Sequence, residues 1–404
     1  MYLLLENAGF RRLWLSSFFS DIHTVTFLMS QGLLTLHITD SVFWVGAVVG
    51  FHGVTLTLGS FIGGVLTDRF YTKRPSLITG ATLLDFVAVL FIAMMMFFGE
   101  IKLWHLILGA VMNGIAISHR SPARSALTLD LVGKKRLVNA IAVNLASWQV
   151  TAISAPIIAG TVITIYDLSW AYVLTACAAA LAFISIVTLK TSIPTDATIE
   201  STKMTNPFHS VIDGVKYVFT VAPVRSLIFL VIVVEIFLWS HESMLPVMAE
   251  KVLEVGPLGL GSILSLGGVG ALISLVFISS FKDIDPNRLL LVATLGLFST
   301  CLILFAFSPW FPLSLGLIAL AYAFGMGYET IISALLLIVV QKRMRGRVLS
   351  FQTVAWGGFG IPGFFMGAIG GTFNASIAIA TGGIVVLIYT LINLRTLLKA
   401  DRSD

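Results

Sequence analysis

Three acidic residues of this sequence, Asp21, Glu235 and Glu329, stand inside long apolar stretches. A charged side chain in the hydrocarbon of a membrane is costly, so such a residue usually faces a water-filled cavity or a partner group. A carboxyl group held in such a cavity can take up and release a proton. We therefore predict that these three residues carry protons in a membrane process. A structural hydrogen bond to a neighbouring helix is the alternative.

Eight further residues are candidates for lining a binding cavity, because ligand cavities are mostly apolar with a few polar groups. They are His23, Asn113, Arg120, Trp148, Gln149, Trp239, His241 and Trp356. For each of them, a position facing lipid or packed between helices is an equal alternative to lining a cavity. Arg120 is also a possible partner for Glu329. The histidines are too scattered for a metal site and no paired ligand spacing occurs, so we expect no metal and no cofactor.

The elements that must position these residues are long and apolar. The chain has 404 residues, of which 57% are hydrophobic and only 11% are charged, whereas soluble domains carry roughly 25% charged residues. A membrane-spanning helix needs about 20 mostly apolar residues, and backbone groups in lipid must be paired within their own segment, which predicts helices. Twelve stretches qualify: 13–37, 42–67, 76–98, 104–128, 138–165, 170–190, 223–247, 258–280, 289–307, 313–340, 348–372 and 377–398.

The charges in the loops indicate which ends of these helices face the cytoplasm. With the N-terminus placed inside, the outward loops contain Lys102 and Lys251 as their only lysine or arginine residues. The other basic residues gather at or near the inner ends, as at 134–136 and 342–347. This is the positive-inside distribution, and it predicts that both termini are cytoplasmic. It also accounts for the net charge of +5, so we expect no nucleic-acid partner.

Short fragments repeat between the two halves of the chain. Residues 125–134 and 333–342 share serine, alanine, leucine, valine and lysine positions at one constant offset. Asp21 and Glu235 likewise occupy matching places in the two halves. Two parallel repeats related by an axis normal to the membrane are a transporter architecture.

We therefore predict an N-terminal six-helix bundle over 1–190 and a C-terminal six-helix bundle over 223–404. The polar stretch 191–222 is predicted to be a cytoplasmic linker. Apolar residues recur at helical spacing in its second part, which indicates a short amphipathic helix on the inner membrane face or an extension of the seventh helix.

Glycines crowd the second and eleventh predicted helices, at Gly46, Gly50, Gly363 and Gly367 among other positions. Small residues let two helices approach each other closely. We therefore predict tight helix packing there. The eleventh helix either bends during function or packs statically.

The turn after the second predicted helix carries a family motif. Residues 64–74 read Gly-Val-Leu-Thr-Asp-Arg-Phe-Tyr-Thr-Lys-Arg, which resembles the loop signature G-x-L-A-D-R-x-G-R-K of the major facilitator superfamily. The resemblance implies a secondary transporter and assigns Gly64, Asp68, Arg69 and Lys73 to an inner gate, with Gly64 allowing close helix approach. An ordinary cytoplasmic turn is the alternative. The same family places the third helix, with Asp85, at the periphery.

Further fragments resemble the branch of this superfamily that contains the enterobactin exporter and the macrolide efflux pumps. They are the arm from Asn7 to Phe19, residues 121–127 and Arg-Gly-Arg-Val at 345–348. Members of the branch are thought to export siderophores, drugs or other amphiphiles. Two antiporter signatures are incomplete here: R-x-x-Q-G reads Ala-Val-Met-Asn-Gly at 110–114, and G-P-x-x-G-G reads Ala-Pro-Ile-Ile-Ala-Gly at 155–160.

The resemblance implies an all-α integral membrane antiporter of a bacterial inner membrane that exports a small amphiphilic compound, such as a siderophore, drug or lipid-like metabolite. An importer or facilitator of a siderophore, nutrient or lysophospholipid is an alternative, since the sequence does not encode direction. A membrane protein that binds a ligand without moving it is a third.

No phosphate-binding loop occurs, so the energy is expected from an ion or substrate gradient. No nucleophile has an assigned base, so no enzyme is expected. We expect a monomer whose partners are a small-molecule substrate, the lipid bilayer and protons.

Overall fold

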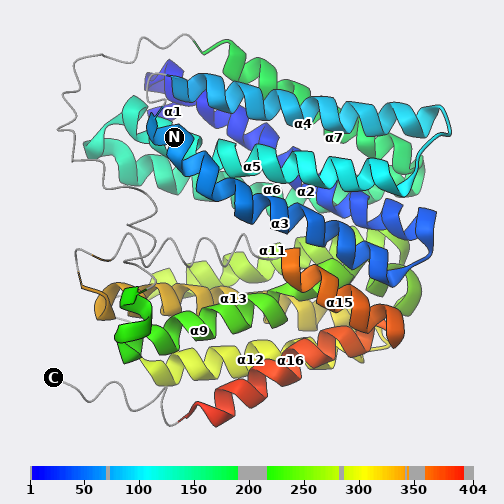
Figure 1. Cartoon of the computed structure of the whole chain (residues 1–404), viewed down its shortest axis with the longest axis vertical. Coiled ribbons are helices and arrows are strands. Elements are labelled where there is room, and N and C mark those ends of the chain that lie inside the picture. The colour runs from blue at the N-terminus through cyan, green and yellow to red at the C-terminus, as the bar shows by residue number, and fades with distance from the viewer. Residues whose placement is uncertain are drawn as a thin grey trace.

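The protein is helical in every element that its computed structural model describes, which covers residues 2–69, 73–189, 216–281, 286–341, 344 and 360–394 (Figure 1). The first helices of the chain lie in the upper part of Figure 1. They are α1 (Tyr2–Glu6), α2 (Ala8–Thr39), α3 (Val42–Arg69), α4 (Arg74–Phe97), α5 (Leu103–Val132), the 3₁₀ turn η2 (Lys134–Arg136), α6 (Leu137–Ile165) and α7 (Leu168–Val187).

The helices of the second part of the chain lie in the lower part of the same view. They are α9 (Ala222–Phe237), α11 (Gly256–Ser280), α12 (Arg288–Ala306), α13 (Phe311–Val339), α15 (Gly360–Thr372) and α16 (Ala375–Ile392). Between α9 and α11 the chain continues through a 3₁₀ segment η3 (Trp239–Met244), a short α10 (Leu245–Val247) and a π-helical segment η4 (Met248–Val252).

Nine helical stretches within the described residues are long and apolar enough to cross a membrane. One of them runs from Leu103 to Ile165 and joins α5 with α6. α2 is not among the nine although it has 32 residues, because buried serines, threonines and charged residues lower its hydropathy. Most helix bounds predicted from the sequence are confirmed to within a few residues, as where 76–98 was expected and α4 spans Arg74–Phe97.

Polar caps explain several of the helix starts. The side chains of Asn7, Asp167, Asn287 and Asn374 each precede a helix and accept hydrogen bonds from backbone N–H groups in its first turn. Those N–H groups have no partner within the helix, so the cap satisfies them. Most of the predicted linker 191–222 lies outside the described residues, and helical structure begins again at residue 216.

Two helix pairs join the first part of the chain to the second at very short range. A Cβ atom built on Gly363 of α15 would lie 2.5 Å from the carbonyl oxygen of Gly46 on α3. In the other pair, a Cβ atom on Gly160 of α6 would lie 2.6 Å from the carbonyl oxygen of Pro257 on α11. Only glycine permits these backbone contacts. The tight packing predicted for the second and eleventh helices is thus confirmed.

Candidate functional site

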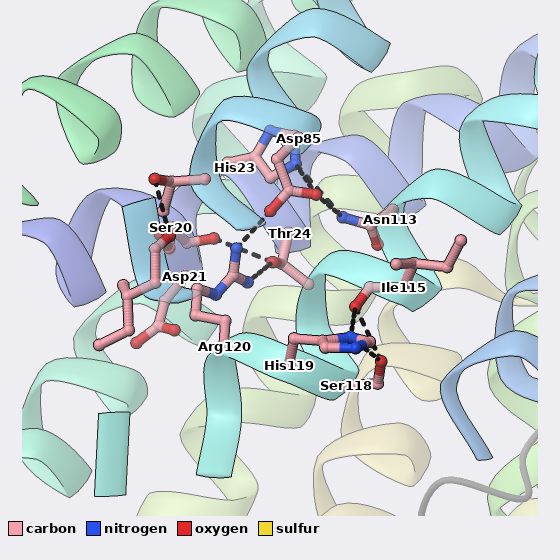
Figure 2. Close-up of polar contacts among 12 residues, drawn as sticks. Ser20, Asp21, His23, Thr24, Asp85, Asn113, Ile115, Ser118, His119 and Arg120 are labelled. Atoms are coloured by element: carbon pink, nitrogen blue, oxygen red, sulfur yellow. Dashed lines mark hydrogen bonds and ion pairs between the residues drawn. The ribbon is translucent and has the colours of Figure 1, made fainter. Parts of the chain in front are cut away.

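Asp85 of α4 is the centre of a buried polar network in the first part of the chain (Figure 2). It forms an ion pair with Arg120 of α5. Its Oδ1 also accepts a hydrogen bond of 2.8 Å from Nδ2 of Asn113, and Nε2 of His23 lies 3.5 Å from the same oxygen. The network therefore ties together α2, α4 and α5.

Arg120 makes a second contact in this network, because its Nη2 donates to Oγ1 of Thr24 at 3.2 Å. One turn further along α5, Nη1 of Arg124 donates to Oδ1 of Asp21 at 3.0 Å. The Asp21 side chain is 8% exposed and that of Arg124 is 23% exposed. Two carboxylates and two guanidinium groups thus balance each other.

These contacts correct two interpretations of the sequence. Asp85 had been discounted as peripheral, yet it lies in the middle of the network, because α4 packs directly against α5 and turns this face inward. Arg120 pairs with Asp85 and not, as suggested, with Glu329. The sequence analysis also missed Arg124 as the partner of Asp21. Its i, i+4 spacing from Arg120 places both guanidinium groups on one face of α5.

The second part of the chain holds its buried charge differently. Glu235 of α9 is 1% exposed. Among the described residues, neither of its carboxylate oxygens has a hydrogen-bond partner in bonding geometry. The carboxyl group of Glu329 is near enough to share a hydrogen bond with it when one of the two carries a proton, and Glu242 is near enough to act on it electrostatically. Like charges therefore meet at this place.

Aromatic rings pack together beside the carboxyl group of Glu242. The hydroxyl group of Tyr322 donates to Oε1 of Glu242 at 2.7 Å. The ring of Trp239 lies 5.6 Å from that of Tyr322 and 5.2 Å from that of Phe298. His241 is fully buried beside them. Two residues predicted to line a cavity, Trp239 and His241, are thus brought together with Glu242.

The remaining predicted cavity residues are dispersed. His23 and Asn113 belong to the Asp85 network, in the other part of the chain from Trp239 and His241. Trp148 is 42% exposed and its neighbour Gln149 is buried with Nε2 unpartnered among the described residues. Trp356 lies outside the described residues.

The predicted inner gate is described only in part. The side chains of Asp68 and Arg69 lie outside the described set, and Lys73 is an exposed residue at the start of α4. A Cβ atom built on Gly64 meets nothing within 4 Å, so the close approach expected there is not found among the described residues. An ion pair that the sequence analysis missed, Arg74–Asp130 at 2.6 Å, joins α4 to α5 beside this turn. Within the described part of the chain, no group of three potential metal ligands occurs.

A bundle of long apolar helices that buries ion pairs and a carboxyl group is typical of integral membrane transporters. The chain matches the Major Facilitator Superfamily over residues 13–364 and belongs to that family. It is therefore a multi-pass membrane transporter and not an enzyme.

Relatives and solved structures agree with this family. The enterobactin exporter EntS of Shigella flexneri is 24% identical over 417 aligned positions, which cover 99% of this chain and 94% of the relative. The same exporter of Shigella dysenteriae serotype 1 (strain Sd197) is 29% identical over 195 positions, which cover 46% of this chain and 44% of the relative. The predicted location, a bacterial inner membrane, agrees with these relatives.

Among solved structures, the nucleoside transporter NupG has a TM-score of 0.74 at 12% identity, covering 98% of this chain and 100% of that one. A peptide transporter POT in complex with sulfate also has a TM-score of 0.74, at 14% identity, covering 97% and 95%. At these identities the likeness establishes the fold and says nothing of the substrate.

Proposed function

We propose that this protein is a proton-coupled antiporter that exports a small amphiphilic compound across the inner membrane by alternating access. Export is favoured because the relatives that align over nearly the whole chain are named as exporters of the siderophore enterobactin. A siderophore is accordingly the first compound class to test, followed by drugs and lipid-like metabolites.

The observation that carries the proton coupling is the environment of Glu235. A buried carboxylate without a hydrogen-bond donor and with like charges beside it is strongly unfavourable when ionised. Binding a proton removes the charge and supplies a donor hydrogen. Glu235 and Glu329 are therefore the proposed proton carriers. Asp21, the third predicted carrier, already has a guanidinium partner in Arg124, and we give it a supporting role.

Alternating access is supported by where the two parts of the chain touch. Gly46 and Gly367 lie near the connections that join α2 to α3 and α15 to α16, and these connections stand at the end of the molecule opposite to α1 and to the last turn of α16 (Figure 1). We propose that this end faces outward, that both termini are cytoplasmic, and that twelve helices form two six-helix bundles. In such transporters the bundles rock about a site near mid-membrane.

We assign the inner gate to the turn after α3, with Asp68, Arg69 and Lys73, as the family motif implies. Arg74 and Asp130 hold α4 against the end of α5 at 2.6 Å beside that turn. This ion pair joins α4 to α5 within the first bundle.

Counterflow in proteoliposomes tests the proposal. Siderophores, cationic drugs and lysophospholipids are offered with and without a pH gradient, in vesicles of known orientation. We expect at least one compound to accumulate in inverted vesicles and its accumulation to rise when the gradient is imposed. Uptake that ignores the gradient would contradict proton coupling, and accumulation only in right-side-out vesicles would contradict export.

A further inference from the structure

The Trp239 cluster, defined as Trp239, His241, Phe298 and Tyr322 together with Glu242, brings aromatic rings and a carboxylate to one place. The residues come from three elements, η3, α12 and α13. The Trp239 and Tyr322 rings meet edge to face at 89°, and the His241 and Tyr322 rings lie 5.5 Å apart. The side chain of Glu242 is accessible to solvent although its partner Tyr322 is buried.

The cluster lies deep in the span. Tyr322 follows Phe311, the first residue of α13, by about 16 Å at 1.5 Å per residue. This is roughly half the thickness of a bilayer's hydrocarbon core. An exposed carboxylate at this depth must face a space that a ligand can reach, since lipid would not tolerate its charge.

Within the described residues, Glu242 lacks an ionic partner and two ring nitrogens of the cluster lack a hydrogen-bond partner. Ion pairs between Glu242 and a basic side chain are absent within the described residues. The fully buried His241 is held through Nδ1, which lies 2.7 Å from the carbonyl oxygen of Leu238. That contact makes Nδ1 the protonated nitrogen and leaves Nε2 as an acceptor without a donor among the described residues. Nε1 of Trp239 is also unpartnered within this set.

We infer that the Trp239 cluster is the binding site for an organic cation, the charged group of the transported amphiphile. Glu242 supplies the opposite charge, and the partly exposed ring of Trp239 attracts the cation through its ring electrons. The unpartnered Nε2 accepts from an ammonium hydrogen where the ligand carries one. This inference rests on the proposed function and adds the substrate class to it.

Aromatic rings decide between an organic cation and a metal ion. A small hard cation requires several oxygen ligands, whereas the cluster offers one carboxylate and four rings. A lipophilic cation gains from the rings as well as from the charge. The site is therefore expected to select a positively charged ligand that carries aromatic or aliphatic groups.

Two ions of the same shape and opposite charge test this inference. Binding of tetraphenylphosphonium and of tetraphenylborate to the purified full-length protein is measured by equilibrium dialysis. We expect saturable binding of the cation, at least about tenfold tighter than that of the anion, because charge attraction and ring contacts both favour it. Equal binding of the two ions, or no saturable binding of the cation, would overturn the inference.

Substitutions locate the binding. Glu242→Gln and Trp239→Leu are each expected to weaken cation binding at least about fivefold, while Glu242→Asp, which keeps the charge, retains more of it than Glu242→Gln. Glu254→Gln removes an exposed carboxylate outside the cluster and is expected to bind like the native protein. Thermal unfolding of each variant confirms that it is folded. Undiminished binding by Glu242→Gln contradicts the assignment.

The outcome also separates this inference from the proposed function. If the cation does not bind the cluster while another compound still shows gradient-dependent counterflow, the substrate class is wrong and the transport proposal stands. If the cation binds the cluster and no compound moves in counterflow, the binding site stands and the transport proposal fails.

Discussion

The two parts of the chain differ in how they neutralise buried charge. In the first part, Asp85 and Asp21 each have a guanidinium partner, in Arg120 and Arg124. In the second part, the buried carboxyl group of Glu235 has the carboxyl groups of Glu329 and Glu242 as its charged neighbours. Balanced pairs fix the rotation of the helices that carry them. Glu235, whose oxygens have no hydrogen-bond donor in bonding geometry among the described residues, is completed by a proton, and its protonation can therefore change during a transport cycle.

The largest effect is expected from breaking the Asp85–Arg120 pair. Arg120→Leu leaves a buried carboxylate without its partner, which costs about 3–5 kcal/mol. The apparent melting temperature in detergent should fall sharply. Removing both charges, in Asp85→Leu with Arg120→Leu, should restore most of the stability because no unpaired charge remains. A double variant as unstable as Arg120→Leu would show that packing, and not charge balance, holds the network.

The opposite result is expected for Glu235. Glu235→Gln removes a charge that has no ionic partner among the described residues, so the melting temperature should stay level or rise. Transport driven by a pH gradient should fall at least about tenfold, equivalent to about 1.4 kcal/mol, while exchange counterflow without a gradient persists. Undiminished gradient-driven transport by this variant would remove the basis for assigning proton coupling to Glu235.

A smaller loss is expected at the pair formed by Asp21 and Arg124. Arg124 is 23% exposed, so water compensates in part when its partner is removed. Arg124→Gln should cost about 1 kcal/mol in stability, measured by thermal unfolding beside Arg120→Leu. An effect as large as that of Arg120→Leu would mean that Asp21 is desolvated as fully as Asp85.

The smallest effect is expected at the surface pair that joins the two parts of the chain, Asp40 and Lys251. Nζ of Lys251 lies 2.5 Å from Oδ1 of Asp40, and this ammonium group lowers the pKa of the Asp40 carboxyl. The pair therefore stabilises the folded protein at pH values above the ordinary pKa of an aspartate. This stabilisation is lost as the pH falls through the lowered pKa. Asp40→Asn should leave the melting temperature unchanged within error at neutral pH, because exposed pairs are screened. A marked drop in the melting temperature of this variant, matched by a similar drop of the native protein in high salt, would show that the ion pair stabilises the fold.

Helix positions could be predicted from the sequence because the apolar length needed to cross a membrane is a local property. The bounds of α4 and α12 are examples, since 76–98 and 289–307 were predicted and the helices span Arg74–Phe97 and Arg288–Ala306. The interruption at η3 was not predicted. Residues 239–244 contain no glycine and no proline, and Pro246 follows them, so the usual local signals of a broken helix are weak.

Side-chain partners could be predicted less well. Asp21 and Glu235 stand at matching places in the two halves of the sequence, but one faces an arginine and the other faces glutamates. Which residues meet depends on how each helix is rotated about its axis. A repeat in the sequence does not fix that rotation. Asp85 shows the same limit, since its depth follows from the packing of α4 on α5.

The 3₁₀ segment between Trp239 and Met244 separates Glu235 from Glu242 by a stretch of altered winding. A 3₁₀ turn advances about 2.0 Å and 120° per residue, against about 1.5 Å and 100° in an α-helix. Rewinding the three steps from Trp239 to Glu242 would swing the second carboxyl group by about 60° and draw it in by about 1.5 Å. A change between 3₁₀ and α-helical winding in this segment would therefore alone change the angle between the proposed proton carrier, Glu235, and the proposed cation site at Glu242.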